Sequence, residues 1–227
     1  MSLNPVLTLR KYPVANAAPV RSELGHLLAI YAVTLQSGLL ASSRLISSAS
    51  EAKPEEAVWY AYIEPNPPSE YMGDDTLPDL LRPDTTRRFI ETTHEKYKSA
   101  VGDEFGTTVP SMYTDEPQYC PMSTLNSAGK GQDIFLPWTE GILGSFKATK
   151  GADLMALLPK IIWDGEEVPV ERYWFLDHVA ELFAENYMGV MARWCTDNGI
   201  LMTGHLNSVS QKALHPKNQS RALLKRL

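Results

Sequence analysis

Apolar and polar residues follow one another along the chain in patterns that predict both strands and helices. Two runs rich in aromatic and β-branched residues, His26 to Leu35 and Ala57 to Glu64, predict strands. Apolar residues spaced three and four apart predict one helix over 84–101 and a longer one from Pro169 to Asn198-Gly199. The same patterns predict further strands over 105–114 and 200–203 and short helices over 138–147 and 152–158.

The order of these elements is typical of parallel β/α units, because strands and helical layers alternate along the sequence. Polar residues follow the predicted strands directly: Glu64 after one, Asp115 and Glu116 after the next, and His205 after the last. In a parallel barrel or an open α/β sheet, ligands bind outside the carboxyl ends of the strands. The sequence therefore predicts a functional site at these strand ends.

The length of 227 residues fits one domain. Residues 1–25 are rich in Pro and Ala without a sustained period, so we interpret them as an irregular lead-in. We expect an α/β domain over 26–211 and a basic tail over 212–227. A loop of about 20 residues precedes Pro137 and is long enough to be a candidate functional loop.

The net charge of the chain limits the kinds of molecule that it is expected to bind. The formal net charge is −6, and residues 1–211 carry 16 basic and 27 acidic residues, so no nucleic-acid surface is expected. The apolar run from Leu27 to Leu35 is too short for a membrane helix, and the amino terminus lacks the pattern of a secretory signal. We expect a cytoplasmic protein without a membrane partner. The oligomeric state is not predicted.

Common nucleotide, serine-hydrolase and zinc motifs are absent from the sequence. Cys120 and Cys195 match no metal or redox spacing, and we interpret both as free thiols. No cofactor and no metal site are predicted.

The strongest candidate for chemistry is the segment Tyr113-Thr114-Asp115-Glu116-Pro117. An acidic pair at the end of an apolar strand is expected to be partly desolvated, and each carboxylate raises the pKa of its neighbour. Such an acid can donate a proton near neutral pH, as glycoside cleavage requires. The alternative is a turn with solvated carboxylates.

His205 and Trp138 are further candidates. Gly204 precedes His205 and lets a substrate or a backbone segment approach closely, so His205 could bind a sugar hydroxyl, orient a carboxylate or ligate a metal. Trp138 opens a predicted helix and could stack on a sugar face. The alternatives are a structural histidine and a core tryptophan.

A metal-dependent hydrolase that uses Asp115, Glu116 and His205 is a third, more distant hypothesis.

The order of several short motifs over about residues 57–205 resembles the catalytic region of α-L-rhamnosidase-like glycoside hydrolases. The motifs are Asp79-Leu80-Leu81-Arg82-Pro83, the run from Arg88 to Tyr97, Phe105-Gly106, Tyr113 to Pro117, Pro137-Trp138-Thr139, Gly151 to Leu154, Leu158-Pro159, Trp194-Cys195 and Thr203-Gly204-His205.

This resemblance implies a (β/α)8 TIM barrel that acts on a carbohydrate substrate, with α-L-rhamnosides as the expected class. It implies that Glu116 is a catalytic carboxylate and that Asp115 and His205 line the sugar subsite. Some enzymes of this kind use calcium, but no residue here supports a calcium site and none is assigned.

The chain departs from the resembled pattern after Gly204-His205. A second catalytic glutamate is expected there, but Leu206 to Gln211 contains no carboxylate and no Asp or Glu occurs after Asp197. Glu64, Asp133 and Glu140 remain alternatives for that role without positional support. About four parallel-type strands would form only a partial barrel. The alternative function is therefore a non-catalytic carbohydrate-binding or vestigial, truncated glycosidase.

Overall fold

The computed structural model describes residues 5–12, 25–66, 68, 70, 75–120, 122 and 133–206, and it divides the chain into two compact units. The sheet unit comprises Pro5–Pro67 and Cys120–His178. The helical unit comprises Pro68–Tyr119 and Val179–Leu227 together with the first four residues. The boundary at 178/179 falls within one helix, and the predicted basic tail over 212–227 lies outside the described residues.

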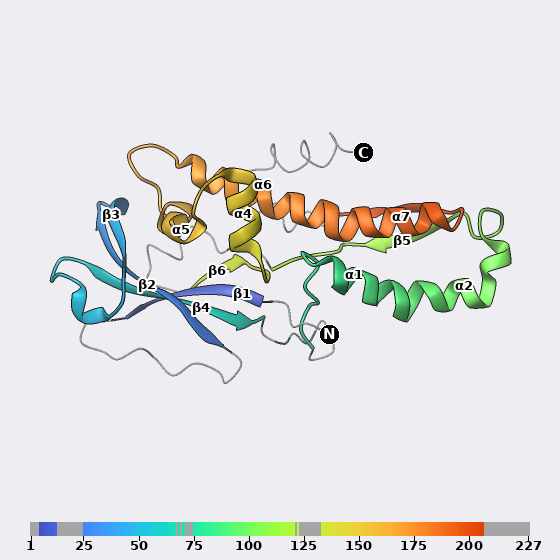
Figure 1. The fold of residues 1–227 in the computed structure, drawn as a ribbon, viewed down its shortest axis with the longest axis horizontal. Coiled ribbons are helices and arrows are strands. Elements are labelled where there is room, and N and C mark those ends of the chain that lie inside the picture. Colours follow the sequence, from blue (N-terminus) through green and yellow to red (C-terminus); the bar gives the residue numbers. More distant parts are fainter. Residues whose placement is uncertain are drawn as a thin grey trace. The chain divides into compact units, whose positions relative to one another are not determined.

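The sheet unit is built on a five-stranded sheet in the order β3-β2-β4-β1-β6, in which every neighbouring pair is antiparallel (Figure 1). Strand β1 lies within the stretch interpreted from the sequence as a lead-in, and it pairs with both β4 and β6. The strands are β1 (Pro5–Tyr12), β2 (His26–Gln36), β3 (Leu39–Ile46), β4 (Ala57–Pro65) and β6 (Ile134–Pro137).

The prediction of a partial (β/α)8 TIM barrel with about four parallel-type strands is wrong. Strands β2 and β4 match the two predicted runs, but they pair antiparallel, with Ala32 opposite Val58. Strand β3 lies between these two runs, where the sequence pattern predicted no strand. Ser37 and Gly38 join β2 to β3 with φ values of 52° and 84°, and two positive φ angles are typical of the tight turn that suits a two-residue hairpin. A hairpin of this kind forces the antiparallel direction.

Both faces of the central strand β4 are buried, which gives the sheet unit two apolar layers. On one face Trp59 packs edge-on against Trp163, with ring centroids 5.0 Å apart, and the Tyr31 hydroxyl donates to the carbonyl oxygen of Met155 at 2.7 Å. The other face carries a cluster covered in part by Ala49 and Ala52. Its members are Ile30, Ala32, Ile46, Val58, Tyr60 and Tyr62.

Three helices belong wholly or partly to the sheet unit. Helix α4 (Ile142–Lys150) and helix α5 (Leu154–Ile162) pack on each other, and α5 also contacts β3. The Asp153 side chain caps α5 by accepting a hydrogen bond from the backbone N–H of Met155 at 3.0 Å. Helix α6 (Val170–Phe183) begins in this unit, where Asp177 pairs with Lys150 at 2.7 Å.

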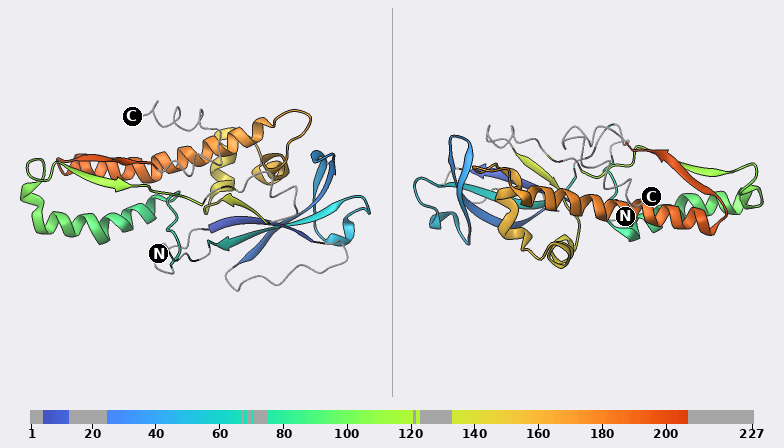
Figure 2. Two further views of the ribbon diagram at one scale, coloured as in Figure 1. Left: turned by 180° about the vertical axis from the view of Figure 1, so that it is seen from behind. Right: turned by 90° about the horizontal axis from the view of Figure 1, so that it is seen from above.

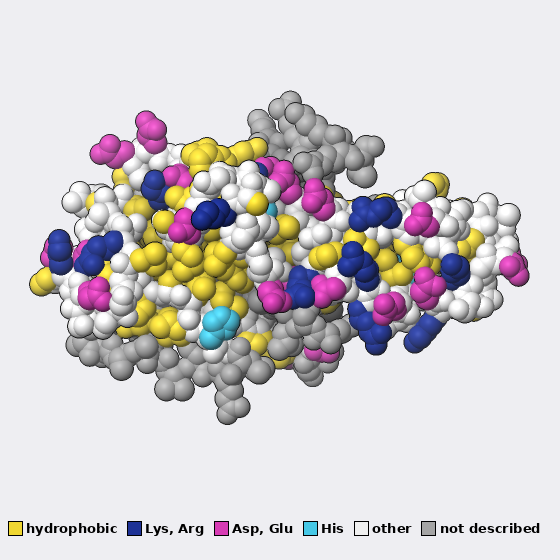
Figure 3. Space-filling view, in the orientation of Figure 1, with side chains coloured by type: hydrophobic (Ala, Val, Ile, Leu, Met, Phe, Trp, Pro, Cys, Tyr) yellow, Lys and Arg dark blue, Asp and Glu magenta, His cyan; other side chains and the backbone are white. Residues whose placement is uncertain are grey.

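The helical unit contains one long helix and most of a second, which begins in the sheet unit, and each is interrupted by one wider π turn. The predicted helix over 84–101 is confirmed as α1 (Pro83–Phe89), the π turn η3 (Ile90–His94) and α2 (Glu95–Val101). The second long helix continues from α6 through η5 (Ala184–Met188) into α7 (Gly189–Asp197). On the face seen in Figure 3, basic and acidic side chains are interspersed along α1 and α2. Arg88 and Glu91 of this stretch form an ion pair of 2.9 Å.

The helical unit also contains two parallel strands, β5 (Ser111–Asp115) and β7 (Leu201–His205), which lie side by side (Figure 2). Helix α2 precedes β5, and α7 precedes β7 after a turn in which Gly199 has φ 70°. This left-handed glycine confirms the predicted end of the long helix. The parallel arrangement predicted for the whole chain is thus found in this one pair among the described strands.

Both cysteines are buried and neither forms a disulfide, as predicted. Burial raises the pKa of Cys120 to about 12 and also raises the pKa of Cys195. Among the described residues, no helix combines the length and the apolar character needed to cross a bilayer.

His94 is a buried titratable group in the helical unit and gives a testable pH dependence. It packs edge-on against Trp194 and Phe89, and burial lowers its pKa although Glu95 acts in the opposite direction. The unfolded chain therefore takes up this proton at a higher pH than the folded chain, so stability falls as the pH drops below about 6.5.

We expect His94→Gln, which cannot take up a proton, to be less destabilising at pH 5.5 than at pH 7.5. The difference cannot exceed about 1.4 kcal/mol per pH unit for one proton. Urea unfolding of both proteins at the two pH values measures it. An equal destabilisation at both values would contradict the neutral buried state of His94.

Candidate functional site

The side chains of the parallel strands β5 and β7 lie on two opposite faces of the pair. Successive side chains of a strand point to opposite faces. On the face toward the helices, the Thr114 hydroxyl lies 2.7 Å from the Tyr187 hydroxyl of the π turn η5, and both residues are buried. The other face is exposed: 62% of Tyr113 and 71% of Leu201 are accessible.

Three predicted site residues meet at the carboxyl ends of these strands. Asp115 is opposite His205 in the register, and its Oδ1 lies 3.1 Å from the Nδ1 of His205. Glu116 follows β5, and its Oε1 lies 3.2 Å from the Nε2 of His205. The imidazole therefore contacts one carboxylate through each of its nitrogens, although His205 and Glu116 are 89 positions apart in the sequence.

The backbone holds Glu116 in an unusual conformation. Its φ of 45° is left-handed, which is uncommon for a residue with a side chain and costs about 1–2 kcal/mol. Its N–H donates to the carbonyl oxygen of His205 at 3.1 Å, extending the strand pairing by one residue. Left-handed residues other than glycine cluster at functional sites, so this geometry marks Glu116 as a residue of interest.

Tyr113 belongs to the same cluster and was not predicted as a site residue. Its hydroxyl lies 2.6 Å from the Nδ1 of His205. The spacing of two residues from Asp115 puts Tyr113 on the same face of β5, so the signal was present in the alternation of the strand. We call Tyr113, Asp115, Glu116 and His205 the strand-end cluster.

The hydrogen bonds of the strand-end cluster admit two proton arrangements. With its proton on Nε2, the neutral His205 donates to Glu116 and accepts the Tyr113 hydroxyl at Nδ1. With both nitrogens protonated, Nδ1 donates to Asp115 instead. His205 can therefore serve as donor or acceptor toward a phenol and as donor toward two carboxylates.

The strand-end cluster is open to solvent. The accessible fractions of the side chains are 41% for Glu116, 55% for His205 and 67% for Asp115. The expected desolvation of the acidic pair by an enclosing barrel is not observed. A ligand can reach these groups directly.

Trp138 belongs to the sheet unit, directly after β6, whereas the strand-end cluster belongs to the helical unit. It is buried, as are its neighbours Pro137 and Thr139. Trp138 therefore belongs to the core of the sheet unit, which was the alternative considered from the sequence.

No group of three or more His, Cys, Asp and Glu side chains among the described residues is arranged to hold a metal ion. A second catalytic glutamate was expected shortly after Gly204-His205. Leu206 is the last described residue of this stretch, so the residues that follow it lie outside the described part of the chain.

Neither a known protein family nor a curated protein matches the sequence. A solved structure of a rhamnosidase from Novosphingobium sp. PP1Y matches with a TM-score of 0.45 and 18% sequence identity. The match covers 74% of this chain and 17% of the rhamnosidase chain, so this chain spans a small part of that protein's length. A similarity of this size is too low to define a fold or a function.

Proposed function

We propose that the chain derives from glycoside hydrolases and that the strand-end cluster acts on an O-glycosidic bond, with Glu116 as the acid or base. The observation that carries the proposal is the meeting of Glu116 and His205 at the carboxyl ends of two parallel strands. Side chains at this edge of parallel strands are the usual source of catalytic groups in α/β proteins.

The chemistry of the cluster fits this role. Glycoside cleavage uses a pair of carboxylic groups, one of which protonates the leaving oxygen. Glu116 is held by His205 and can exchange a proton with it. Asp115 is the carboxylate on the other side of the same imidazole and supplies a second acidic group for a sugar hydroxyl. The motif order quoted above favours an α-L-rhamnoside as substrate.

Glu116→Gln keeps the size and the hydrogen-bonding ability of the side chain but removes its acidity. We expect the hydrolysis rate of 4-nitrophenyl α-L-rhamnoside to fall by about 10²–10⁴-fold, the usual contribution of a general acid or base. Glu104→Gln is a matched control, because Glu104 is an exposed glutamate of the same unit and is not part of the strand-end cluster. Equal rates for the wild type and Glu116→Gln would contradict the proposed role of Glu116.

The exposure of the strand-end cluster favours a second candidate, which is carbohydrate binding without hydrolysis. Tyr113 presents an accessible ring beside His205, with centroids 6.2 Å apart, and an accessible aromatic ring can pack on a sugar face. Isothermal titration calorimetry with L-rhamnose separates the two candidates. Binding that is lost in Tyr113→Ala, without turnover of the aryl glycoside, supports the second candidate over the first.

A further inference from the structure

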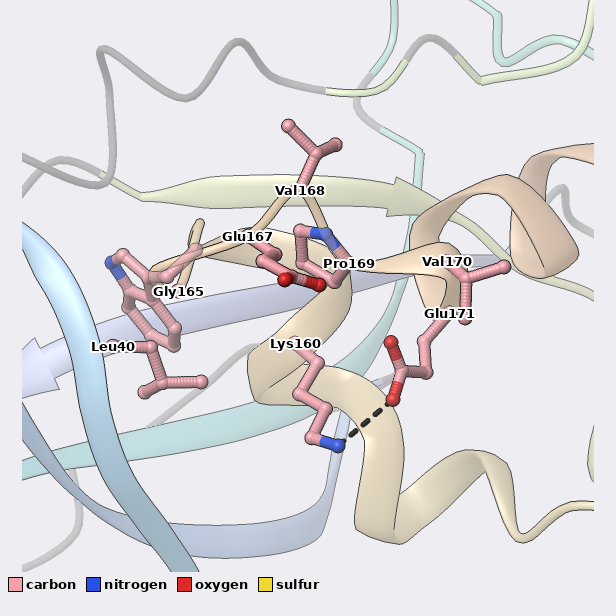
Figure 4. A pocket seen from close by; sticks show the side chains of 9 residues that line it. Leu40, Lys160, Gly165, Glu167, Val168, Pro169, Val170 and Glu171 are labelled. Carbon is pink, nitrogen blue, oxygen red and sulfur yellow. Dashed lines mark hydrogen bonds and ion pairs between the residues drawn. The ribbon is translucent and has the colours of Figure 1, made fainter.

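Residues of the sheet unit line a hollow of about 330 Å³ beside the end of α5 and the first turn of α6 (Figure 4). Its rim is open, since 79% of Val168 is accessible. Lys160 and Glu171 at this hollow pair with each other at 2.8 Å, as the dashed line in Figure 4 shows. Its chemistry therefore singles out no class of ligand. A buried polar contact in the helical unit is more informative.

This contact joins the hydroxyl groups of Thr114 and Tyr187, which lie 2.7 Å apart although the residues are 73 positions apart in the sequence. Thr114 lies on β5 directly before Asp115 and Glu116, and Tyr187 belongs to the π turn η5. Both residues are buried. Burial raises the pKa of the Tyr187 phenol, although the hydrogen bond with Thr114 acts in the opposite direction. The phenol therefore stays protonated at neutral pH, and the two hydroxyls remain hydrogen-bonded.

The π turn lies at the place where the second long helix meets β5. The N–H of Gly189 donates to the carbonyl oxygen of Ala184, five residues earlier, whereas an α-helix would pair it with the residue four earlier. The extra residue widens the turn, and Tyr187 lies inside it. Turns of this kind occur frequently at functional sites. The turn at which the helix is widened is therefore the turn that contacts β5.

A second contact fixes the chain on the other side of Glu116. Tyr119, three residues after Glu116, packs edge-on against Phe183 at the end of α6, with ring centroids 5.4 Å apart. Phe183 in turn stacks on Tyr187, with centroids 5.5 Å apart and an angle of 13° between the rings. The segment from Thr114 to Tyr119 is therefore held at both ends by adjoining residues of the second long helix.

Glu116 lies between these two contacts and has the left-handed φ of 45°. A residue with a side chain keeps such a conformation only where its surroundings impose it. From the side of β7, the carbonyl oxygen of His205 accepts the Glu116 N–H. We infer that Tyr187 is a positioning residue: its hydroxyl fixes Thr114, and this contact holds Glu116 in the conformation that reaches His205. This role does not depend on the reaction proposed for the strand-end cluster.

Tyr187→Phe tests this role, because it keeps the ring on Phe183 and removes the hydroxyl alone. NMR spectroscopy of the full chain reports the sign of φ at Glu116, since a positive φ brings the amide and Hα protons of one residue close together and gives a strong nuclear Overhauser effect. We expect this signal to fall to the level of the β5 residues, and the signals between the His205 ring and the Glu116 side chain to weaken with it. The Glu116 N–H should exchange with solvent at least about tenfold faster, because Thr114 is left with an unpaired buried hydroxyl.

Three further variants separate the hydrogen bond from other effects. Tyr97→Phe is the matched control, because Tyr97 is an exposed tyrosine of the same unit, and it should leave the Glu116 signals unchanged. Thr114→Val removes the same hydrogen bond from the side of β5 and should reproduce the effect of Tyr187→Phe. Thr114→Ser keeps a hydroxyl and should retain the wild-type signals.

The positioning role is overturned if the strong Glu116 signal persists in Tyr187→Phe or in Thr114→Val. A lower free energy of unfolding with that signal unchanged overturns it as well, since Tyr187 would then only support the core. If Tyr187→Phe does not fold, Thr114→Val decides by the same measurement. None of these measurements uses hydrolysis, so their failure is distinct from a failure of the acid or base role of Glu116, which Glu116→Gln tests.

Discussion

Gly204→Ala is expected to separate β5 from β7 and to dismantle the strand-end cluster. Gly204 has a φ of 150°, in a region that residues with a side chain rarely adopt. A Cβ atom at this position would overlap the carbonyl oxygen of Thr114 on the paired strand and lie 2.9 Å from the Thr114 Cγ2 atom. The obstructing atom is backbone, so it cannot turn away as a flexible side chain would.

We expect this substitution to destabilise the helical unit by at least about 3 kcal/mol, since it combines backbone strain with overpacking. Amide hydrogen exchange is the suitable measurement because it reports each unit separately. The Glu116 N–H, which donates to the carbonyl oxygen of His205, should lose its protection.

Gly102→Ala provides the matched control in the same unit. Gly102 has an ordinary helical φ of −60°, and an added Cβ would lie 3.5 Å from the flexible Lys98 side chain, an ordinary contact. We expect it to leave the exchange of β5 and β7 unchanged. Unchanged protection in Gly204→Ala would show that the two strands are not paired as described.

The elements of the fold were easier to predict from the sequence than their pairing. The helix over 84–101 was found from the apolar spacing, and β2 and β4 were found from their aromatic and β-branched residues. Both faces of β4 are buried, and a strand buried on both faces lacks the polar alternation that distinguishes an antiparallel sheet. The direction of pairing was therefore predicted incorrectly.

Strand β3 was not predicted because its sequence also lacks a clear strand pattern. Its serines and Arg44 resemble a polar connector, and its edge position leaves most of its side chains exposed. The turn before it is Ser37-Gly38, which lacks the Asn-Gly or Asp-Gly pair that signals a tight hairpin most clearly. Arg44 pairs with the buried Glu56 at 2.8 Å, a contact across 12 positions of the sequence that the local pattern does not reveal.

The strand-end cluster could be predicted in part because chain order alone places residues at the ends of strands. Asp115 ends β5, Glu116 follows it and His205 ends β7, and parallel strands bring their carboxyl ends together. Trp138 could not be placed in this way, because whether an aromatic ring lies in a core or beside a ligand depends on packing that involves distant residues. Tyr113 could be predicted as a site residue only from the alternation along β5, which places it on the same face as Asp115 two positions later.

Trp59→Ala is expected to be the most destabilising substitution in the sheet unit. Trp59 is almost fully buried on β4, between β2 and β1 in the sheet, and its ring packs against Trp163 after α5. Removal of a buried tryptophan loses its transfer free energy and leaves a cavity, which together cost about 3–5 kcal/mol.

Urea unfolding monitored by tryptophan fluorescence and far-UV circular dichroism measures this loss, with Tyr173→Ala as the control. Tyr173 is an aromatic residue of the same unit, but it is half exposed on α6, so we expect its removal to change the free energy of unfolding by no more than about 0.5 kcal/mol. A loss below about 1 kcal/mol in Trp59→Ala would mean that α5 does not cover this face of the sheet.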